Sequence, residues 1–366
     1  MLKPIEHKFK ALFFRLLKST LQKRSGDNKP LEATKIKTVI FFRPERIGDM
    51  VVTLPIVDGL KTFFPQIKVS VLASPKNLDL IKDDPRFDEI FLYTKDPRRD
   101  ITELFRIRHR KFDCVIDTIC DDSVTALFLS HFCAAGKPII GVGKEKYKEY
   151  YNFSYANRTG HIIDNSLKLL EAFGISSEEL SGFAAPYLST TVQNNAEVFV
   201  NSFSKNGSRP VRVGYNLSSG APTRVWPRDK CVKLISNILA SFPESQVVLI
   251  AVPGDRAQAL SISNQFAKDV QVVPDNLGIS EVSAIIKYLD VLVTPDTSLV
   301  HIARANRVPV VGLYSKNSKN FGLWHPYAMI ENAVTSQSDD NIFDITVDQV
   351  MDKLLPTIIS GMGIKR

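Results

Sequence analysis

The sequence contains no long hydrophobic run, few cysteines and no dinucleotide-binding glycine motif. No apolar stretch approaches the roughly 20 residues needed to cross a bilayer, and none at the N-terminus resembles a signal peptide. Neither half of the chain carries G-x-G-x-x-G after its first predicted strand, which argues against nicotinamide or flavin binding. The four cysteines lack a C-x-x-C pair and metal-ligand spacing with histidine, so we expect buried free thiols and a cytoplasmic protein. They are Cys114, Cys120, Cys133 and Cys231.

Excess positive charge is confined to the N-terminus. Residues 1–37 hold ten basic and three acidic residues, whereas the rest of the 366-residue chain holds 37 basic and 36 acidic ones. The net charge of +8 therefore does not indicate a nucleic-acid-binding surface. With 44% hydrophobic and 23% charged residues, the composition is that of a globular protein, and its length corresponds to about two or three domains.

The first 21 residues repeat apolar side chains at helical spacing, with lysine and arginine mostly on the other face. This pattern predicts a basic amphipathic helix, followed by a linker over 25–30. Such a helix can lie in a membrane interface and be attracted to anionic lipids, or it can pack against its own domain. The apolar positions are Leu2, Ile5, Phe9, Leu12, Phe13, Leu16, Leu17 and Leu21.

From Lys35 onward, short runs rich in Val, Ile and Phe alternate with helical patterns. Strands that are apolar on both faces are typical of a parallel sheet covered by helices. Two such series predict an α/β protein with two doubly wound, Rossmann-like domains facing a central cleft. The predicted strands are Thr38–Arg43, Lys68–Ala73, Glu89–Tyr93, Asp113–Thr118, Pro138–Val142, Val211–Asn216, Val247–Ala251, Val270–Val273, Val291–Thr294 and Val308–Tyr314.

These patterns divide the chain into five parts. We expect the basic helix and linker over 1–34, an N-terminal domain over 35–175, an interdomain linker over 176–190, a C-terminal domain over 191–345 and a C-terminal helix over 346–366. A helix over His161–Phe173 is expected to end at Gly174, a C-cap position. Thr346 and Gln349 form a capping-box pattern for the last helix.

The first predicted strand is followed by a segment, 43–55, that could carry chemistry. In an open α/β sheet, ligands bind beyond the carboxyl ends of the strands. Asp49 lies there, and its carboxylate could accept a proton from a substrate hydroxyl. The alternative is that Asp49 caps a helix starting near Met50.

Three loops of the second series have residues suited to a nucleotide diphosphate. Segment 293–303 leads from a buried strand into a helix whose N-terminus favours a phosphate, with Asp296, Thr297, Ser298 and His301 close by. Segment 216–227 offers Ser218 and Ser219 for close approach to an anion and Arg224 for its charge. Asp255, after the next strand, could hold ribose hydroxyls. The alternatives are helix capping for Asp255 and Asp296 and core packing for His301.

Taken together, segments 46–55, 224–227 and 295–303 resemble glycosyltransferase family nine, which includes ADP-heptose:lipopolysaccharide heptosyltransferases. The resemblance extends through 164–174 and covers roughly residues 36–358 in matching order. It implies a GT-B fold and an inverting, metal-independent transfer of a sugar from a nucleotide sugar to the lipopolysaccharide inner core. Ser298 stands where many relatives have glycine, which leaves the sugar donor open.

The resemblance also implies roles for individual residues. Asp49 matches the general base, and Arg224 matches the basic phosphate ligand before the Trp-Pro pair. Asp296, Thr297, Ser298 and His301 match the donor-binding loop, and Asp255 matches the ribose-binding acidic position. Apart from the resemblance, the loop residues Ser218 and Ser219 are also expected to bind the donor, and Arg43 and Arg46 beside Asp49 are expected to bind the acceptor. We expect no cofactor and no metal, with ADP-heptose as donor and a lipid-linked glycan as acceptor.

Two alternatives to heptose transfer remain open. One is a GT-B transferase that uses another nucleotide sugar or a different glycan acceptor. The other is a non-catalytic protein that binds nucleotide sugars at the membrane surface. In each case we expect a peripheral position on the inner face of the bacterial inner membrane, held by the basic helix.

Overall fold

The computed structural model describes residues 21–24, 29–157, 160–202, 209–266, 268–316 and 321–364. The chain divides into two compact units. The first unit holds the described residues up to Leu78 together with Pro85–Gly182. The second holds Asp79–Asp84 and the described residues from Phe183 onward. Apart from Leu21, the basic helix predicted for the first 21 residues lies outside the described residues.

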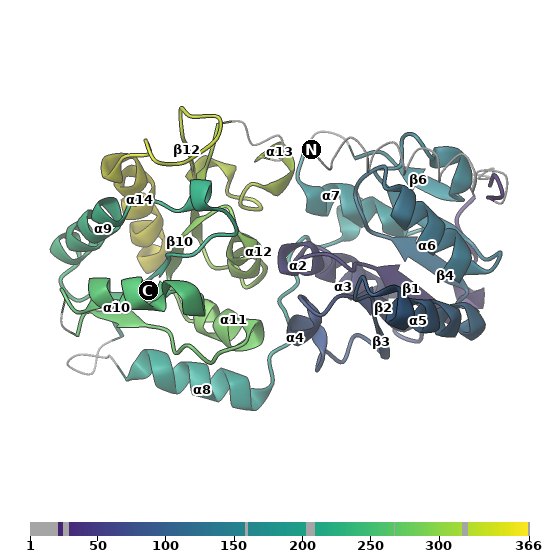
Figure 1. Ribbon diagram of the computed structural model, residues 1–366, viewed down its shortest axis with the longest axis horizontal. Helices are drawn as coiled ribbons and strands as arrows, with labels where there is room; N and C mark the ends of the chain where they lie inside the picture. Colours follow the sequence, from purple (N-terminus) through teal and green to yellow (C-terminus); the bar gives the residue numbers. More distant parts are fainter. Residues whose placement is uncertain are drawn as a thin grey trace. The chain divides into compact units, whose positions relative to one another are not determined.

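The first unit is built on a parallel sheet with the strand order β3-β2-β1-β4-β5-β6 (Figure 1). Continuous apolar runs make the central strands. Val39, Ile40, Phe41 and Phe42 of β1, for example, are completely buried, as expected for a sheet covered on both faces. The strands are β1 (Thr38–Phe42), β2 (Lys68–Ala73), β3 (Glu89–Leu92), β4 (Cys114–Asp117), β5 (Ile139–Val142) and β6 (Phe153–Tyr155).

Helices connect these strands in two groups. One group is α5 (Pro97–Arg110) and α6 (Val124–Ala134), which contact each other. The other is α3 (Leu54–Phe63), α7 (Ile162–Leu167) and the 3-10 helix η3 (Lys168–Phe173), which also contact one another. The remaining short helices are η1 (Ala33–Lys35), α2 (Ile47–Val51), α4 (Leu78–Ile81), η2 (Lys148–Tyr150) and η4 (Ser177–Glu179).

The second unit repeats the same strand order, β12-β11-β10-β7-β8-β9, again all parallel (Figure 1). Its strands are β7 (Arg212–Asn216), β8 (Gln246–Ile250), β9 (Val270–Val272), β10 (Val291–Pro295), β11 (Val310–Tyr314) and β12 (Ala333–Thr335). Its helices are α8 (Thr190–Asn201), η5 (Pro222–Arg224), α9 (Arg228–Ser241), η6 (Pro253–Asp255), α10 (Arg256–Ser263), α11 (Ile279–Lys287), α12 (Ser298–Ala305), α13 (Phe321–Trp324), η7 (Ile330–Asn332) and α14 (Val347–Ile364).

The strands predicted from sequence are all present, with ends shifted by a residue or two. The sequence analysis missed β6 and β12, two edge strands of three residues each, which are too short to show a pattern. The helix expected over His161–Phe173 changes from α7 to η3 and ends at Gly174, whose φ of 81° is left-handed. The capping box is confirmed, because Thr346 N donates to Gln349 Oε1 (2.8 Å) and Gln349 N to Thr346 Oγ1 (3.2 Å).

Each sheet has one point where the strand order reverses. In the first unit β1 lies between β2 and β4, and in the second β7 lies between β8 and β10. The connections leave such neighbouring strands towards opposite faces and open a crevice at their carboxyl ends, where doubly wound folds bind ligands. A ligand site is therefore expected in the loops after β1 and β4 of the first unit, and in those after β7 and β10 of the second.

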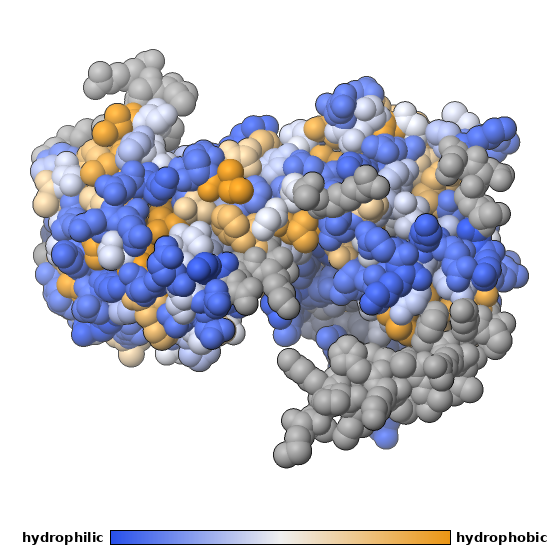
Figure 2. Space-filling model, turned by 90° about the horizontal axis from the view of Figure 1, so that it is seen from above, coloured by the Kyte–Doolittle hydropathy of each residue, from blue (hydrophilic) through white to orange (hydrophobic). Residues whose placement is uncertain are grey.

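The membrane-span and cysteine expectations can be compared with the structure. Among the described residues, no helix is both long enough and apolar enough to cross a membrane. All four cysteines are free; Cys114, Cys133 and Cys231 are buried and Cys120 is half-buried. The face seen in Figure 2 is mostly hydrophilic, with apolar residues scattered between the polar ones on both units.

Candidate functional site

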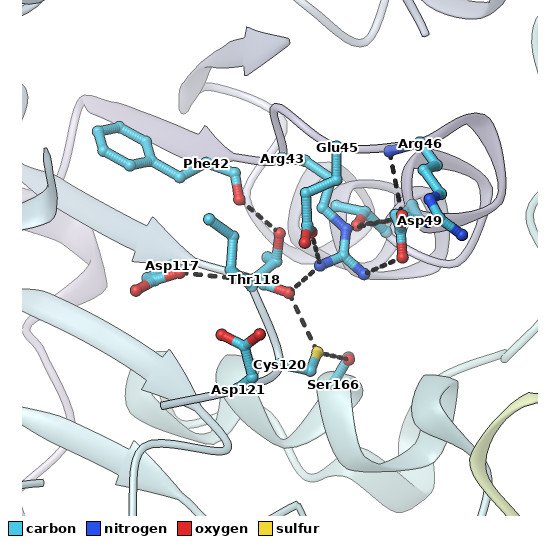
Figure 3. Close-up of polar contacts among 12 residues, drawn as sticks. Phe42, Arg43, Glu45, Arg46, Asp49, Asp117, Thr118, Cys120, Asp121 and Ser166 are labelled. Carbon is cyan, nitrogen blue, oxygen red and sulfur yellow. Dashed lines mark hydrogen bonds and ion pairs between the residues drawn. The ribbon is translucent and has the colours of Figure 1, made fainter. Parts of the chain in front are cut away.

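Asp49 lies at the reversal point of the first sheet, in the short helix α2 that follows β1 (Figure 3). The helix begins at Ile47, so Asp49 is its third residue and not the N-cap that we considered as the alternative. Asp49 Oδ2 accepts a hydrogen bond from Arg46 N (3.0 Å), which satisfies a free N–H at the helix start. The side chain is 18% exposed. Since a carboxylate has about four acceptor positions, this bond leaves capacity for a substrate hydroxyl.

The guanidinium of Arg43 lies directly behind Asp49. Its Nε donates to the Asp49 carbonyl oxygen (2.8 Å), and its Nη2 is 3.7 Å from Asp49 Oδ1. Its Nη1 donates to Glu45 Oε2 (2.9 Å) and to the Thr118 carbonyl oxygen. The Arg43 side chain is only 2% exposed. One buried cation therefore joins the backbone of α2, two carboxylates and the loop after β4.

These charges affect one another. Burial by itself would lower the pKa of Arg43, but Asp49 and Glu45 hold the pKa above its ordinary value. Burial raises the pKa of the Glu45 carboxyl; Asp49 adds to that rise while Arg43 opposes it. Burial thus makes the Glu45 carboxyl harder to ionise.

The loop after β4 is fixed from the other side by a second buried cation. Lys144 and Asp117 are both completely buried, with Nζ and Oδ2 3.0 Å apart. Lys144 Nζ also donates to the carbonyl oxygens of Ile119 (2.5 Å) and Asp121 (3.0 Å). Tyr151 donates its hydroxyl to Asp117 Oδ2 (2.8 Å). This network holds the loop after β4. Figure 3 shows how that loop supplies the Thr118 carbonyl to Arg43.

The burial of Arg43 corrects one expectation. We expected Arg43 and Arg46 to bind the acceptor, but Arg43 is 1% exposed and its donors are already used within the unit. Its geometry is that of a residue that positions Asp49. Arg46 is exposed, and its role at the acceptor stays a prediction. The sequence analysis also missed Thr118 and Lys144, for which no local signal exists because their partners lie far away along the chain.

In the second unit, Ser218 and Asp255 lie together after β7 and β8. Ser218 Oγ donates to Asp255 Oδ2 (2.6 Å) and accepts from Val252 N (2.9 Å). Asp255 is at the N-cap position of α10, but its side chain makes no capping hydrogen bond. Asp255 therefore holds the N-cap position that we considered, but the alternative that its side chain caps the helix is wrong. The Asp255 carboxylate and the Ser218 hydroxyl form a half-buried polar pair in the loops after the strands.

Arg224 and Asp296 form a second pair, between the loops after β7 and β10. Arg224 Nη1 donates to Asp296 Oδ2 (3.1 Å) and to its carbonyl oxygen (2.8 Å). About 30% of each side chain is exposed. Trp226, two residues further on, anchors this segment in the core, since it is 1% exposed and its Nε1 donates to Ile345 O (3.0 Å). The sequence thus places a cation on a rigid support beside the reversal point.

Two threonines and Asn216 form the hydrogen bonds at the start of α12. Thr297 is the N-cap, with its Oγ1 accepting from Leu299 N (3.3 Å), so the capping alternative is also wrong for Asp296. Asn216, the last residue of β7, donates to Thr294 Oγ1 (2.9 Å) and Thr297 Oγ1 (3.2 Å). It joins the loops after β7 and β10. Sequence reasoning did not single out Asn216, although a polar residue at the end of a buried strand was a usable signal.

The positions of the other predicted donor-binding residues say less about donor binding. Ser298 is the first residue of α12 and is half-buried. Ser219 Oγ donates within its own loop, to Ala221 O (2.5 Å). His301 is 6% exposed, and its ring packs edge-on against Trp324 at 5.4 Å. This is the core packing that we weighed as its alternative role, and contact of His301 with a donor stays a prediction.

Comparisons with known proteins agree with this arrangement. The model of glycosyltransferase family 9 (heptosyltransferase) matches residues 103–346. The chain is 22% identical to lipopolysaccharide heptosyltransferase 3 of Escherichia coli over 299 residues, which covers 76% of this chain and 82% of that protein. It is 20% identical to the lipopolysaccharide core heptosyltransferase OpsX of Haemophilus influenzae, covering 84% of this chain and 86% of the relative.

Solved structures share the fold. A family 9 glycosyltransferase from Veillonella parvula has a TM-score of 0.72 at 17% identity, covering 88% of this chain and 97% of the other. The ADP-heptose heptosyltransferase II of E. coli has a TM-score of 0.68 at 18% identity, covering 89% of this chain and 99% of the other. With the two parallel sheets described above, these likenesses show the GT-B fold. The chain therefore belongs to glycosyltransferase family 9, the heptosyltransferase family, and is a glycosyltransferase.

Proposed function

We propose that this protein is an inverting glycosyltransferase that moves heptose from ADP-heptose to a hydroxyl of the lipopolysaccharide inner core. The observation that carries the proposal is that both sheets have reactive polar residues at their reversal points. The first has the supported carboxylate of Asp49, and the second has the paired side chains of Arg224 and Asp296. A base and an anion-binding surface are the two parts that such a transfer needs.

Asp49 acts as the general base in this proposal. Its carboxylate takes the proton of the acceptor hydroxyl as that oxygen bonds to the anomeric carbon of the sugar. The bond from the anomeric carbon to the phosphate oxygen breaks on the opposite side, and the nucleoside diphosphate leaves with the electron pair. Arg43 holds the backbone and carboxylate of Asp49, so the base stays in one orientation through the reaction.

The loops of the second unit bind the donor. Arg224 and the N-terminus of α12 at Thr297 and Ser298 stabilise the charge that develops on the diphosphate. Arg224 is paired with Asp296 in this structure, so a bound diphosphate competes with the Asp296 carboxylate for its guanidinium. The half-buried Asp255 carboxylate is suited to ribose hydroxyls. These groups stabilise the leaving diphosphate by protein charge, and we propose a reaction without metal ion or cofactor.

The choice of ADP-heptose and of the inner core rests on relatives. An E. coli heptosyltransferase with a TM-score of 0.68 was solved with ADP, and curated relatives are named for lipopolysaccharide heptosyl transfer. An acceptor of this kind is anchored in a membrane. We accordingly propose a peripheral position on the inner face of the bacterial inner membrane. The basic amphipathic pattern at the N-terminus supports this position, and deletion of residues 1–30 is expected to weaken binding to anionic liposomes.

The decisive experiment offers the purified protein a panel of nucleotide sugars and core-lipid acceptors. Products are identified by mass spectrometry, and the anomeric configuration of the new linkage is read by NMR. We expect turnover with ADP-heptose, an inverted linkage and no loss of activity in EDTA. Turnover only with another nucleotide sugar would identify a different transferase. Donor binding without any product would identify a non-catalytic binding protein.

A further inference from the structure

We propose that the outer face of α5 and α6 in the first unit binds an anionic membrane surface directly. The face consists of Arg98, Ile101, Phe105, Arg108 and His109 on α5, with Phe128 and Phe132 on α6. It lies on the described part of the chain and does not include the loops after β1 and β4. The inference does not rest on the proposed function, because it concerns a surface and not the sugar that is transferred.

Helix α5 separates its side chains between two faces. Arg98, Ile101, Phe105, Arg108 and His109 are spaced by three or four residues and therefore share one face. Ile101 is 56% exposed and Phe105 is 47% exposed, so this face holds apolar surface that would gain free energy by leaving water. A face that mixes exposed apolar side chains with cations and contains no carboxylate is typical of helices lying at a membrane interface.

The acidic side chains of α5 lie elsewhere and are occupied. Asp100 is buried and accepts from Thr94 N (2.7 Å) and Thr94 Oγ1 (2.9 Å). Glu103 accepts from Arg106 Nη1 (3.1 Å), and Arg106 and Arg110 both pair with Glu89 on β3. Charge neutralisation is therefore confined to the neighbouring side of the helix.

The apolar part of the face continues onto α6. The rings of Phe105 and Phe132 meet edge-on with centroids 5.2 Å apart, and Phe128 stacks on Phe132 at 6.2 Å. Arg108 lies over the Phe132 ring at 5.0 Å and donates to the Phe132 carbonyl oxygen. The Arg108 cation therefore lies beside aromatic rings. In membrane-bound proteins, aromatic side chains commonly lie at the level of the lipid headgroups while arginine contacts the lipid phosphates.

A cavity of about 370 Å³ adjoins the same aromatic rings. Arg24 and Arg108 both line it, together with Phe128, His131 and Phe132. One water molecule takes about 30 Å³ of liquid volume, so the cavity has room for a phosphate group and its waters. Two guanidiniums beside apolar rings suit an anionic lipid headgroup, since the phosphate meets the charges and the adjoining glycerol meets the rings.

The charge of the N-terminal sequence supports the same occupant. Leu21, the first described residue, packs against the core cluster beneath α6 and lines this cavity. Residues 1–24 contain seven basic residues and one acidic residue. The net positive charge of this sequence and the cations of the aromatic face would both be attracted to an anionic surface.

The test uses the full-length protein with an environment-sensitive fluorophore on Phe105→Cys. Phe343→Cys on the second unit is the matched control, because Phe343 is 45% exposed against 47% for Phe105. Labelled protein without either substitution corrects for the native cysteines. With vesicles that contain phosphatidylglycerol, we expect a blue shift at position 105 and none at 343, and with phosphatidylcholine alone no shift at either.

A second measurement is vesicle sedimentation of Ile101→Ser with Phe105→Ser. We expect this pair to lower the partition coefficient on phosphatidylglycerol vesicles by about a hundredfold, since each buried apolar side chain contributes about tenfold. Ile359→Ser with Phe343→Ser should leave partitioning unchanged. Activity on a soluble acceptor fragment is measured in parallel, so that failure of the membrane inference is distinct from failure of the proposed reaction.

Three results would overturn the inference. The first is vesicle binding with no shift at position 105, or an equal shift at 343, which would place the contact elsewhere. The second is a label at 105 that is already blue-shifted without vesicles, which would mean that the N-terminal residues or a second copy of the chain cover the face. The third is a full-length protein that does not bind phosphatidylglycerol vesicles.

Discussion

Arg43 and Asp49 contact each other through two different groups of the aspartate. Arg43 Nε holds the Asp49 carbonyl oxygen at 2.8 Å, while Nη2 lies 3.7 Å from the carboxylate Oδ1. Arg43 is buried and Asp49 is 18% exposed. The cation therefore supports the carboxylate from inside the unit, and the carboxylate faces the surface, which is the arrangement that a positioned base requires.

Replacing Asp49 with asparagine tests the base. Asn keeps the shape and can still accept from Arg46 N, but it cannot take a proton from the acceptor. We expect kcat to fall by about two to four orders of magnitude. Donor affinity, measured by calorimetry with ADP, should stay unchanged because Asp49 belongs to the first unit. Near-wild-type turnover in D49N would remove Asp49 from the mechanism.

Replacing Arg43 tests the positioning role. Arg43→Met leaves Glu45 and Asp49 without their buried partner, and we expect a loss of about 3–5 kcal/mol in the free energy of unfolding of the first unit, measured in urea. Arg43→Lys keeps the charge but cannot make the same set of hydrogen bonds. It should recover much of the stability, lower kcat and leave KM for the donor nearly unchanged.

Arg46→Met is the matched control for Arg43, because Arg46 is exposed and its contact with Asp49 is made by its backbone. Its stability should change by less than about 0.5 kcal/mol. A fully active Arg43→Met protein would show that the buried cation is structural only.

Removing Arg224 tests donor binding. Arg224→Ala takes away the guanidinium that pairs with Asp296 and is expected to weaken ADP binding by about tenfold to a hundredfold, since hydrogen bonds to charged groups contribute about 1.5–3 kcal/mol. Arg228→Ala is the control, because Arg228 is exposed and donates to Ser261 Oγ (2.8 Å). Equal ADP affinities of the two variants in calorimetry would contradict the assignment.

The buried pair of Lys144 and Asp117 makes a prediction about stability. Lys144→Met leaves the Asp117 carboxylate buried without its cation and should cost about 3–5 kcal/mol in the free energy of unfolding. Adding Asp117→Leu should recover most of this loss, because no buried charge remains. Lys61→Met removes the more exposed pair with Asp88 and should cost about 1 kcal/mol or less. Similar losses for the two lysines in urea unfolding would refute the argument.

His131 makes the stability of the first unit depend on pH. Burial lowers the pKa of His131 from 6.5 to about 4. Between these values the unfolded chain takes up a proton that the folded chain does not, so stability is full above pH 6.5 and falls as the pH drops towards 4. We expect a contribution on the order of 1–2 kcal/mol after solvent screening.

The measurement for His131 is the melting temperature of the wild type and of His131→Gln across this pH range. The variant should lose less stability on acidification than the wild type. His109→Gln, at an exposed position, should follow the wild type. If His131→Gln and wild type fall in parallel, other groups control the acid sensitivity.

Much of the fold was predictable because local patterns carry it. Buried strands such as β1 and β10 read as continuous apolar runs, and polar loops follow them at regular spacing. Asp49, Arg224 and Asp296 could be predicted as site residues, because each lies just after a buried strand or in the loop that follows it. The strand-order reversals then explain why those loops, and not others, hold the polar clusters.

The sequence alone therefore determined three things. They are the two α/β series, the loops that carry polar residues and the confinement of the excess positive charge to the N-terminus. The tertiary structure decided which of the neighbouring charges Arg43, Glu45 and Arg46 is buried. That choice depends on Thr118, 75 residues further along the chain, whose carbonyl reaches Arg43 only when β1 and β4 pair. Burial and long-range hydrogen bonds arise from packing, and they place Arg43 behind Asp49. The sequence showed only three charged residues within four positions.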